Sequence, residues 1–212
     1  MKASSATIHC FERDQIPDSD KSFRTHSINF FYRNLGSLDA AKRLADLGYL
    51  CEVANILRSA LEQFAFCSKL SSLGGTEDFK SIRPIHSLNH LKNHVPAAGQ
   101  LYGLMSKYTH FEYDHHTHFF AYRSGKIQTI QKGSVLRAYA THLLFMTMVC
   151  VAKYILSVSP TQFSKVPRSI LDIDIFIENV YKYSDDVCCM LPRDEVLANM
   201  DILLQDIVRK TS

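Results

Sequence analysis

Apolar side chains recur along most of the chain at steps of three and four residues, the spacing that places them on one face of an α-helix. The clearest case spans residues 50–70, and its apolar positions are Val53, Ile56, Leu57, Ala60, Leu61, Phe64 and Cys67. The opposite side of this segment carries little charge, so we expect it to lie at the centre of a bundle. A second segment, residues 134–158, is apolar on all sides and predicts another enclosed helix.

Shorter amphipathic segments predict the rest of the bundle, and they cover residues 18–35, 38–47, 87–94, 97–110, 169–183 and 193–210. We expect Gly36 and Ser37 to break the chain between the first two of them. Near residues 117–131, β-branched and aromatic residues flank Ser124–Gly125, which predicts a short β-hairpin. The predicted fold class is all-α, a single helical bundle of six or seven helices over residues 18–212, preceded by an N-terminal arm at residues 1–17.

Composition is that of an ordinary soluble globular protein. The chain has 46% hydrophobic and 21% charged residues, and its formal net charge of +3 is far below that of a dedicated nucleic-acid binder. The most apolar run, residues 143–152, is too short to cross a membrane, which takes about 20 residues. The first thirty residues contain no apolar signal segment and the six cysteines form no zinc-binding pattern. We therefore expect a cytoplasmic protein with no membrane attachment.

Two sets of polar residues lie at helical spacing within the apolar segments. Arg58 and Glu62 are four residues apart, and a second ridge at steps of four is formed by Tyr102, Ser106 and His110. If the two ridges face each other, they gather a guanidinium, a carboxylate, an imidazole and two hydroxyls in one groove. Histidine transfers protons near neutral pH and arginine holds phosphate, so these five residues are the candidate catalytic group. The structural alternative is a rim ion pair, mutually bonded hydroxyls and a histidine that ends a helix.

Further histidines lie near these ridges. Arg83 and His90 form a second arginine–histidine pair, which we treat as candidate substrate-binding residues, although such a pair also arises by chance. Residues 110–118 (HFEYDHHTH) are dense in histidine and acidic residues. Their spacing matches no established zinc motif, so we expect a polar loop there, with no metal and no cofactor. The chain also lacks a phosphate-binding glycine loop and a nucleophile elbow.

Two stretches of the sequence together resemble a known family. ANILRSALEQFAFCSKL contains the pattern R-S-x-x-E, LYGLMSKYTHFEYDHH contains Y-x-x-x-S-x-x-x-H, and a long apolar helix follows. This arrangement, over residues 38–158, is similar in outline to the HEPN superfamily of helical proteins. The resemblance implies functional roles for the arginine and glutamate of the first pattern and for the tyrosine, serine and histidine of the second. It also implies a homodimer and a metal-independent endoribonuclease activity in toxin–antitoxin or anti-phage systems.

The catalytic signature of that superfamily is an arginine followed a few positions later by a histidine. Here the only local match runs from Arg83 to His90, and Pro84 directly follows the arginine. Proline disfavours helical geometry at the residue before it. Either the catalytic arginine lies elsewhere, or the chain has no nuclease activity.

Three hypotheses for the function follow. The first is a HEPN-like effector that acts on RNA, as the endoribonuclease of a bacterial toxin or anti-phage defence system. The second is a non-catalytic helical module that binds a protein partner, such as an antitoxin, or a small ligand in the polar groove. A neutral surface around Arg58 and His110 would favour this second hypothesis. The third is a metal-dependent hydrolase at the histidine cluster. We rank the RNA effector first.

Overall fold

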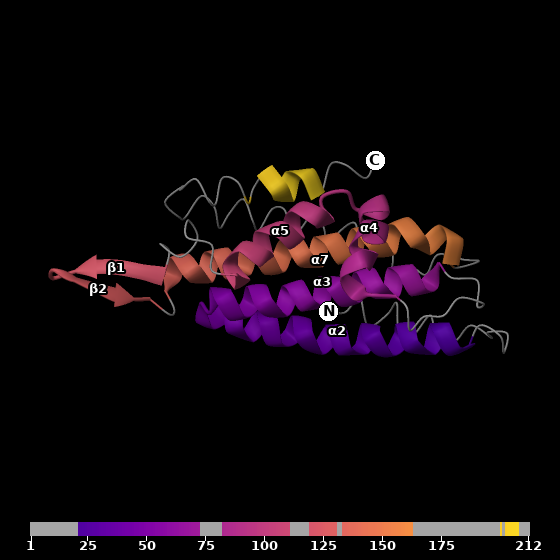
Figure 1. The fold of residues 1–212 in the computed structure, drawn as a ribbon, viewed down its shortest axis with the longest axis horizontal. Helices are drawn as coiled ribbons and strands as arrows, with labels where there is room; N and C mark the ends of the chain where they lie inside the picture. Colours follow the sequence, from indigo (N-terminus) through magenta and orange to yellow (C-terminus); the bar gives the residue numbers. More distant parts are fainter. Residues whose placement is uncertain are drawn as a thin grey trace.

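The fold is a helical bundle with one β-hairpin at its end (Figure 1). The computed structural model describes residues 21–72, 82–110, 119–130, 133–162, 200 and 202–207. The elements are α2 (Lys21–Leu47), α3 (Leu50–Ser71), α4 (Pro84–His94), α5 (Ala98–Thr109), β1 (Phe120–Arg123), β2 (Lys126–Thr129) and α7 (Ser134–Gln162). A further short helical segment covers residues 202–207. The predicted all-α bundle with a short hairpin is confirmed.

Helix α3 forms the centre of the bundle, as its apolar pattern predicts. It contacts α2, α4, α5 and α7. Its apolar positions Val53, Leu57, Ala60 and Leu61 are fully buried. At about 25 cal/mol per Å² of apolar surface, such burial on several sides supplies much of the stability of the bundle. Two polar residues that α3 carries toward α5, Arg58 and Glu62, stay partly accessible to solvent.

Helix α2 runs without a break from Lys21 to Leu47, so the predicted interruption at Gly36–Ser37 is wrong. A glycine inside a helix costs about 1 kcal/mol relative to alanine. Packing against α3 outweighs this cost, because Leu38 and further residues along the same face are buried in the core. The Ser37 hydroxyl is satisfied inside the helix, since it donates a hydrogen bond to the carbonyl of Arg33 one turn earlier.

Helix α7 begins where it is predicted to begin and extends four residues further than expected. The stretch Val135–Ser157 is long and apolar enough to cross a membrane, yet 72% of its most apolar window is buried inside the protein. The run 143–152 is the core of this stretch, and Leu143, Met146 and Cys150 are fully buried. Burial of this kind is typical of the core helix of a soluble protein.

Two turns at one end of the bundle require glycine. Gly48 joins α2 to α3 with φ +82°, and a Cβ there would lie 2.9 Å from the carbonyl oxygen of Gly133, just before α7. The hairpin turn has φ +53° at Ser124 and φ +75° at Gly125, as a two-residue type I′ turn requires. The strands pair antiparallel, with Arg123 opposite Lys126.

Several predicted segments lie outside the described residues. These are the N-terminal arm at 1–17, the helix at 169–183, and most of the histidine-rich stretch, at 111–118. Of the predicted last helix, only residues 200 and 202–207 are described. Residues 200 and 202–207 are helical. Their apolar side chains are buried, as the predicted stripe requires: Met200, Leu203, Leu204 and Ile207.

Candidate functional site

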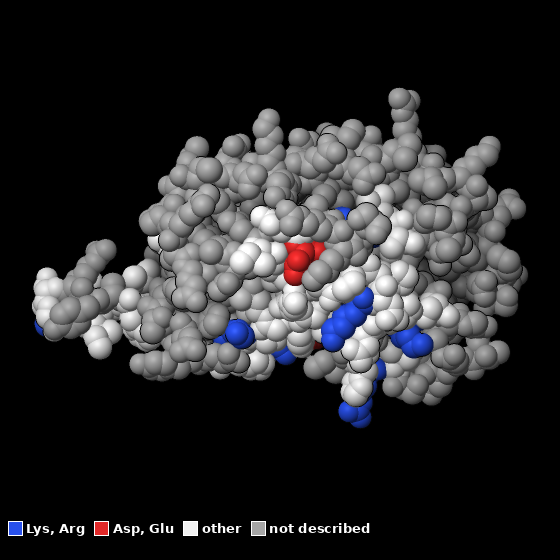
Figure 2. Space-filling view, turned by 90° about the horizontal axis from the view of Figure 1, so that it is seen from above, with Lys and Arg blue, Asp and Glu red and all other residues white. Residues whose placement is uncertain are grey.

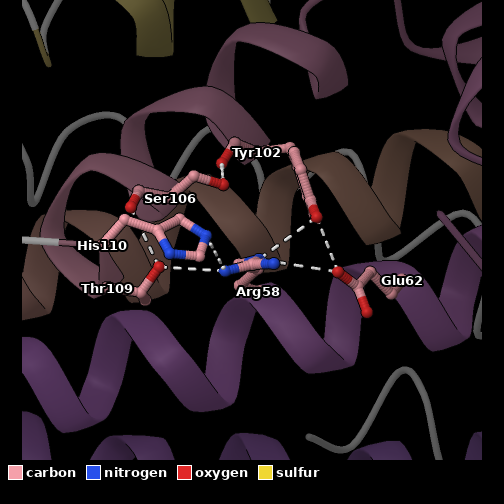
Figure 3. A network of polar contacts seen from close by, with 6 residues as sticks. All are labelled: Arg58, Glu62, Tyr102, Ser106, Thr109 and His110. Carbon is pink, nitrogen blue, oxygen red and sulfur yellow. Dashed lines mark hydrogen bonds and ion pairs between the residues drawn. The ribbon is translucent and has the colours of Figure 1, made fainter.

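An arginine and a histidine that are 52 residues apart in sequence meet between α3 and α5. Arg58 lies in the middle of α3, and its side chain is 22% exposed. His110 is the first residue after α5, and it is exposed. The Arg58 Nη1 and His110 Nε2 atoms are 3.0 Å apart, within hydrogen-bond distance (Figure 3). The expectation that the two ridges face each other is confirmed for this pair.

On its other side, the Arg58 guanidinium contacts a tyrosine and a glutamate. Arg58 Nε donates a hydrogen bond of 3.2 Å to the Tyr102 hydroxyl, which in turn donates one of 2.7 Å to Glu62 Oε1. Arg58 Nε also lies 3.5 Å from Glu62 Oε1, an ion pair within α3. The guanidinium carbon is 5.2 Å from the centroid of the Tyr102 ring, a cation–π distance. These contacts fix the plane of the guanidinium.

A fifth residue, Thr109, completes the group that we call the Arg58 cluster: Arg58, Glu62, Tyr102, Thr109 and His110. Arg58 Nη1 donates a hydrogen bond of 3.0 Å to Thr109 Oγ1, and the Thr109 hydroxyl donates to the carbonyl of Ser106. The ridge at steps of four does not include Thr109. It lies seven residues after Tyr102, a spacing that also returns to the same helix face.

Ser106 plays a different part from the one predicted. Its hydroxyl donates a hydrogen bond of 2.9 Å to the carbonyl of Tyr102, and its own carbonyl accepts from Thr109 and from the backbone N–H of His110. Ser106 therefore shapes the last turn of α5 and bonds to the backbone instead of to the guanidinium. Of the five residues predicted for the site, four are joined directly and Ser106 supports them.

The contact with Arg58 determines which tautomer His110 adopts. A guanidinium can only donate, so Nε2 must accept, which requires a neutral imidazole with its proton on Nδ1. Histidine is able to take up a proton only through a nitrogen with a free lone pair, and here that lone pair is engaged by Arg58. Any proton transfer through Nε2 therefore requires the guanidinium to move toward another acceptor.

Tyr102 is held in its protonated form. Its pKa is raised above the usual value by burial, and also by the hydrogen bond that it donates to Glu62; the hydrogen bond from Arg58 acts in the opposite direction. With Tyr102 and His110 neutral, the cluster contains one positive and one negative charge. Arg58 Nη2 makes no hydrogen bond with any residue that the structure describes. The arrangement can bind a phosphate or carboxylate beside an imidazole.

The second pair, Arg83 and His90, is not brought together in the same way. Arg83 precedes α4 in an extended conformation (φ −97°, ψ 132°), as expected before Pro84, and is exposed. Within the described segment no hydrogen bond joins its side chain to His90. His90 instead stacks on His94, with ring centroids 5.4 Å apart, and His94 Nδ1 lies 3.0 Å from the Ser157 hydroxyl of α7.

Burial and nearby positive charge lower the pKa of His90. The effect of burial is the largest, followed by His94 and then Lys69. Burial likewise lowers the pKa of His94, whose ring also meets the edge of Tyr154 on α7. Among the described residues these contacts make His90 and His94 part of the packing between α4 and α7. A substrate-binding role for Arg83 and His90 remains a prediction.

Other candidate chemistry is limited in the part of the chain that the structure describes. The thiols of Cys67 and Cys150 are buried, which raises the pKa of each to about 12, and partial burial raises that of Cys51 to about 11. Thiols with such values are poor nucleophiles at neutral pH. No three potential metal ligands gather among the described residues. Most of the histidine-rich stretch lies outside them.

Surface charge is divided rather than continuous. Figure 2 shows the molecule from above, turned by 90° from Figure 1. On this face the described Lys and Arg side chains form separate groups with uncharged surface between them. The described acidic side chains on this face gather near its centre. A continuous basic surface, which would steer nucleic acid toward a site, is not formed by the described residues on this face.

Comparisons with known proteins leave the family open. No protein-family model matches the chain, and neither a curated protein nor a solved structure matches it significantly. The geometry of the Arg58 cluster and the sequence patterns that carry its residues are therefore the features that bear on function.

Proposed function

We propose that this protein is a HEPN-like effector that cleaves RNA at the Arg58 cluster without a metal ion. The observation that carries the proposal is the 3.0 Å contact between Arg58 Nη1 and His110 Nε2, which joins a phosphate-binding group to a proton-transfer group. A second support is the position of the contact, because Arg58 is partly accessible and His110 is exposed. Family membership, RNA as substrate and a role in toxin or anti-phage systems are parts of this proposal.

The reaction that fits these groups is an internal transfer at an RNA phosphodiester. A phosphate accepts hydrogen bonds from Arg58, and the guanidinium turns away from His110, which frees the Nε2 lone pair. His110 then takes the proton of the ribose 2′-hydroxyl while the 2′-oxygen attacks phosphorus. The bond from phosphorus to the 5′-oxygen breaks and this oxygen takes up a proton from water, which produces a 2′,3′-cyclic phosphate and a 5′-hydroxyl. His110 then releases its own proton to solvent.

The other members of the cluster hold one side of the guanidinium during this step. Glu62 and Tyr102 hold its Nε side, while Nη1 exchanges its hydrogen bonds to His110 and Thr109 for the phosphate oxygens. A positioned positive charge stabilises the negative charge that develops on the phosphate oxygens in the transition state. Because Tyr102 keeps its proton, it is a further neutral donor beside Arg58.

The test is cleavage of RNA in the presence of EDTA. Wild-type protein should cut total RNA or tRNA, whereas Arg58→Ala and His110→Ala should each reduce the rate about 100-fold or more. His86→Ala is the matched control, since His86 is an exposed histidine of α4 outside the Arg58 cluster. His90→Ala tests the second pair separately. Absence of cleavage by the wild type, or equal cleavage by His110→Ala, would overturn the proposal.

A second function is favoured by the charge of the site. The Arg58 cluster carries one charge of each sign, and basic groups are separated on the face in Figure 2. A non-catalytic module that binds a protein partner, such as an antitoxin, or an anionic small ligand needs no basic surface. In that case the wild type would not cleave RNA, and Arg58→Ala would weaken binding of the partner.

A further inference from the structure

The hairpin formed by β1 and β2 stands apart from the bundle. In Figure 1 it extends beyond the ends of α2 and α3, and the same projection is seen from above in Figure 2. All four residues of β2 are exposed, Ile127 by 74%, and Phe120 at the base of β1 is 46% exposed. An isolated two-stranded hairpin is only marginally stable in water. A projecting hairpin with exposed apolar residues is therefore an element suited to binding.

The charge of this hairpin has one sign. No acidic residue occurs between Asp114 and Asp172 in the sequence, so the hairpin and its flanks carry only basic charges. Arg123 and Lys126 are direct cross-strand partners next to the turn, and Lys126 is exposed. Like charges at directly opposed positions destabilise a β-ladder. A bound anion offsets repulsion between these two positions, which favours a polyanionic partner over an apolar one.

The hairpin is connected closely to the Arg58 cluster. Only residues 111–118 separate His110 from Phe119, where the hairpin begins. At most about 3.6 Å per residue, this connection holds the base of the hairpin within about 32 Å of His110. A nucleic-acid strand of moderate length is therefore long enough to contact both.

We infer that the β1–β2 hairpin is an RNA-binding arm, which holds the phosphates of the strand whose neighbouring phosphodiester lies at the Arg58 cluster. The inference rests on the proposed function, since it assigns RNA as the common ligand. Arg123 and Lys126 neutralise phosphates near the turn. Two-stranded β-ribbons contact nucleic acid in other proteins, where they enter the grooves of DNA.

Equilibrium binding separates this inference from the question of catalysis. Fluorescently labelled single-stranded RNA of 20 nucleotides is titrated with the full-length His110→Ala protein in EDTA, and anisotropy is measured at several salt concentrations. The hairpin variant R123Q/K126Q is compared with K42Q/R43Q, which removes the same charge from exposed positions of α2. A third variant, R123K/K126R, keeps the charge of the hairpin.

The hairpin variant should bind RNA about 25-fold more weakly at 0.1 M salt, and its slope of log affinity against log salt should fall by about 1.4, because each phosphate contact contributes about 0.7. The α2 control and the charge-conserving variant should bind like their parent. Equal affinity of R123Q/K126Q and the parent would overturn the inference, even if the wild type cleaves RNA. Binding that depends on the hairpin without any cleavage would support the arm and overturn only the proposed function.

Two further outcomes also decide against the arm. If the wild type neither binds nor cleaves RNA, the arm and the proposed function both fail. If sedimentation shows a dimer that Ile127→Lys dissociates, while RNA binding is the same in every hairpin variant, the hairpin is instead a contact between two copies of this chain.

Discussion

Removal of the Tyr102 hydroxyl tests whether the Arg58 cluster is a connected network. In Tyr102→Phe the donor to Glu62 and the acceptor for Arg58 are lost together, at distances of 2.7 and 3.2 Å. A hydrogen bond to a charged group contributes about 1.5–3 kcal/mol when fully buried. Glu62 is 25% exposed and keeps its 3.5 Å contact with Arg58, so neither charge is left unpaired. We therefore expect a loss of about 1–2 kcal/mol in the free energy of unfolding.

Urea denaturation monitored by circular dichroism measures this loss, with an unchanged dependence on denaturant. The matched control is Tyr49→Phe, because the Tyr49 hydroxyl makes no hydrogen bond with any described residue; it should change stability by no more than about 0.5 kcal/mol. Glu62→Gln, alone and combined with Tyr102→Phe, completes a double-mutant cycle, with an expected coupling of about 1 kcal/mol. A coupling of zero, or wild-type stability of Tyr102→Phe, would refute the network.

Three further predictions concern stability and reactivity. Gly48→Ala should lower the free energy of unfolding by about 2 kcal/mol or more, because the residue has a positive φ and no room for a Cβ. Urea denaturation measures this loss, and wild-type stability of the variant would contradict the close approach of Gly48 to Gly133. His90 and His94 have lowered pKa values, so the unfolded chain binds protons more readily. Their contribution to stability should be complete above about pH 6.5 and decline at lower pH, and this decline should shrink in His90→Asn; an unchanged pH profile would count against it. Cys67 and Cys150, with pKa values of about 12, should escape iodoacetamide at pH 8 in the folded protein but react in urea, as peptide mass spectrometry detects; rapid labelling of the folded protein would show that they are not enclosed.

The helices that are enclosed could be predicted from the sequence, because burial imposes a regular spacing on apolar residues. Helix α3 follows this rule over its whole length, and α7 does so until it passes the expected end at 158. The interruption predicted at Gly36 shows where local signals fail. Glycine inside a helix costs about 1 kcal/mol relative to alanine. This cost is smaller than the packing energy of the neighbouring turns of α2 against α3, and the local sequence does not reveal that packing.

The members of the site were predictable in part for the same reason. Spacing by four placed Arg58 with Glu62, and Tyr102 with His110, but the contact between the two helices depends on how α5 is rotated against α3. That rotation is set by core residues of both helices. The spacing by four does not include Thr109, whose hydrogen bond with Arg58 depends on this rotation of α5. The same spacing includes Ser106, although its hydroxyl bonds to the backbone.

Joint action of Arg58 and His110 on one phosphate is tested most directly by single-turnover cleavage of RNA in EDTA by Arg58→Ala, His110→Ala and the double variant. Groups that serve the same step lose their effect together. The double variant should therefore cleave within about threefold of the slower single variant, each being about 100-fold or more below the wild type. Full cleavage by either single variant, or losses that multiply in the double variant, would contradict a shared catalytic site.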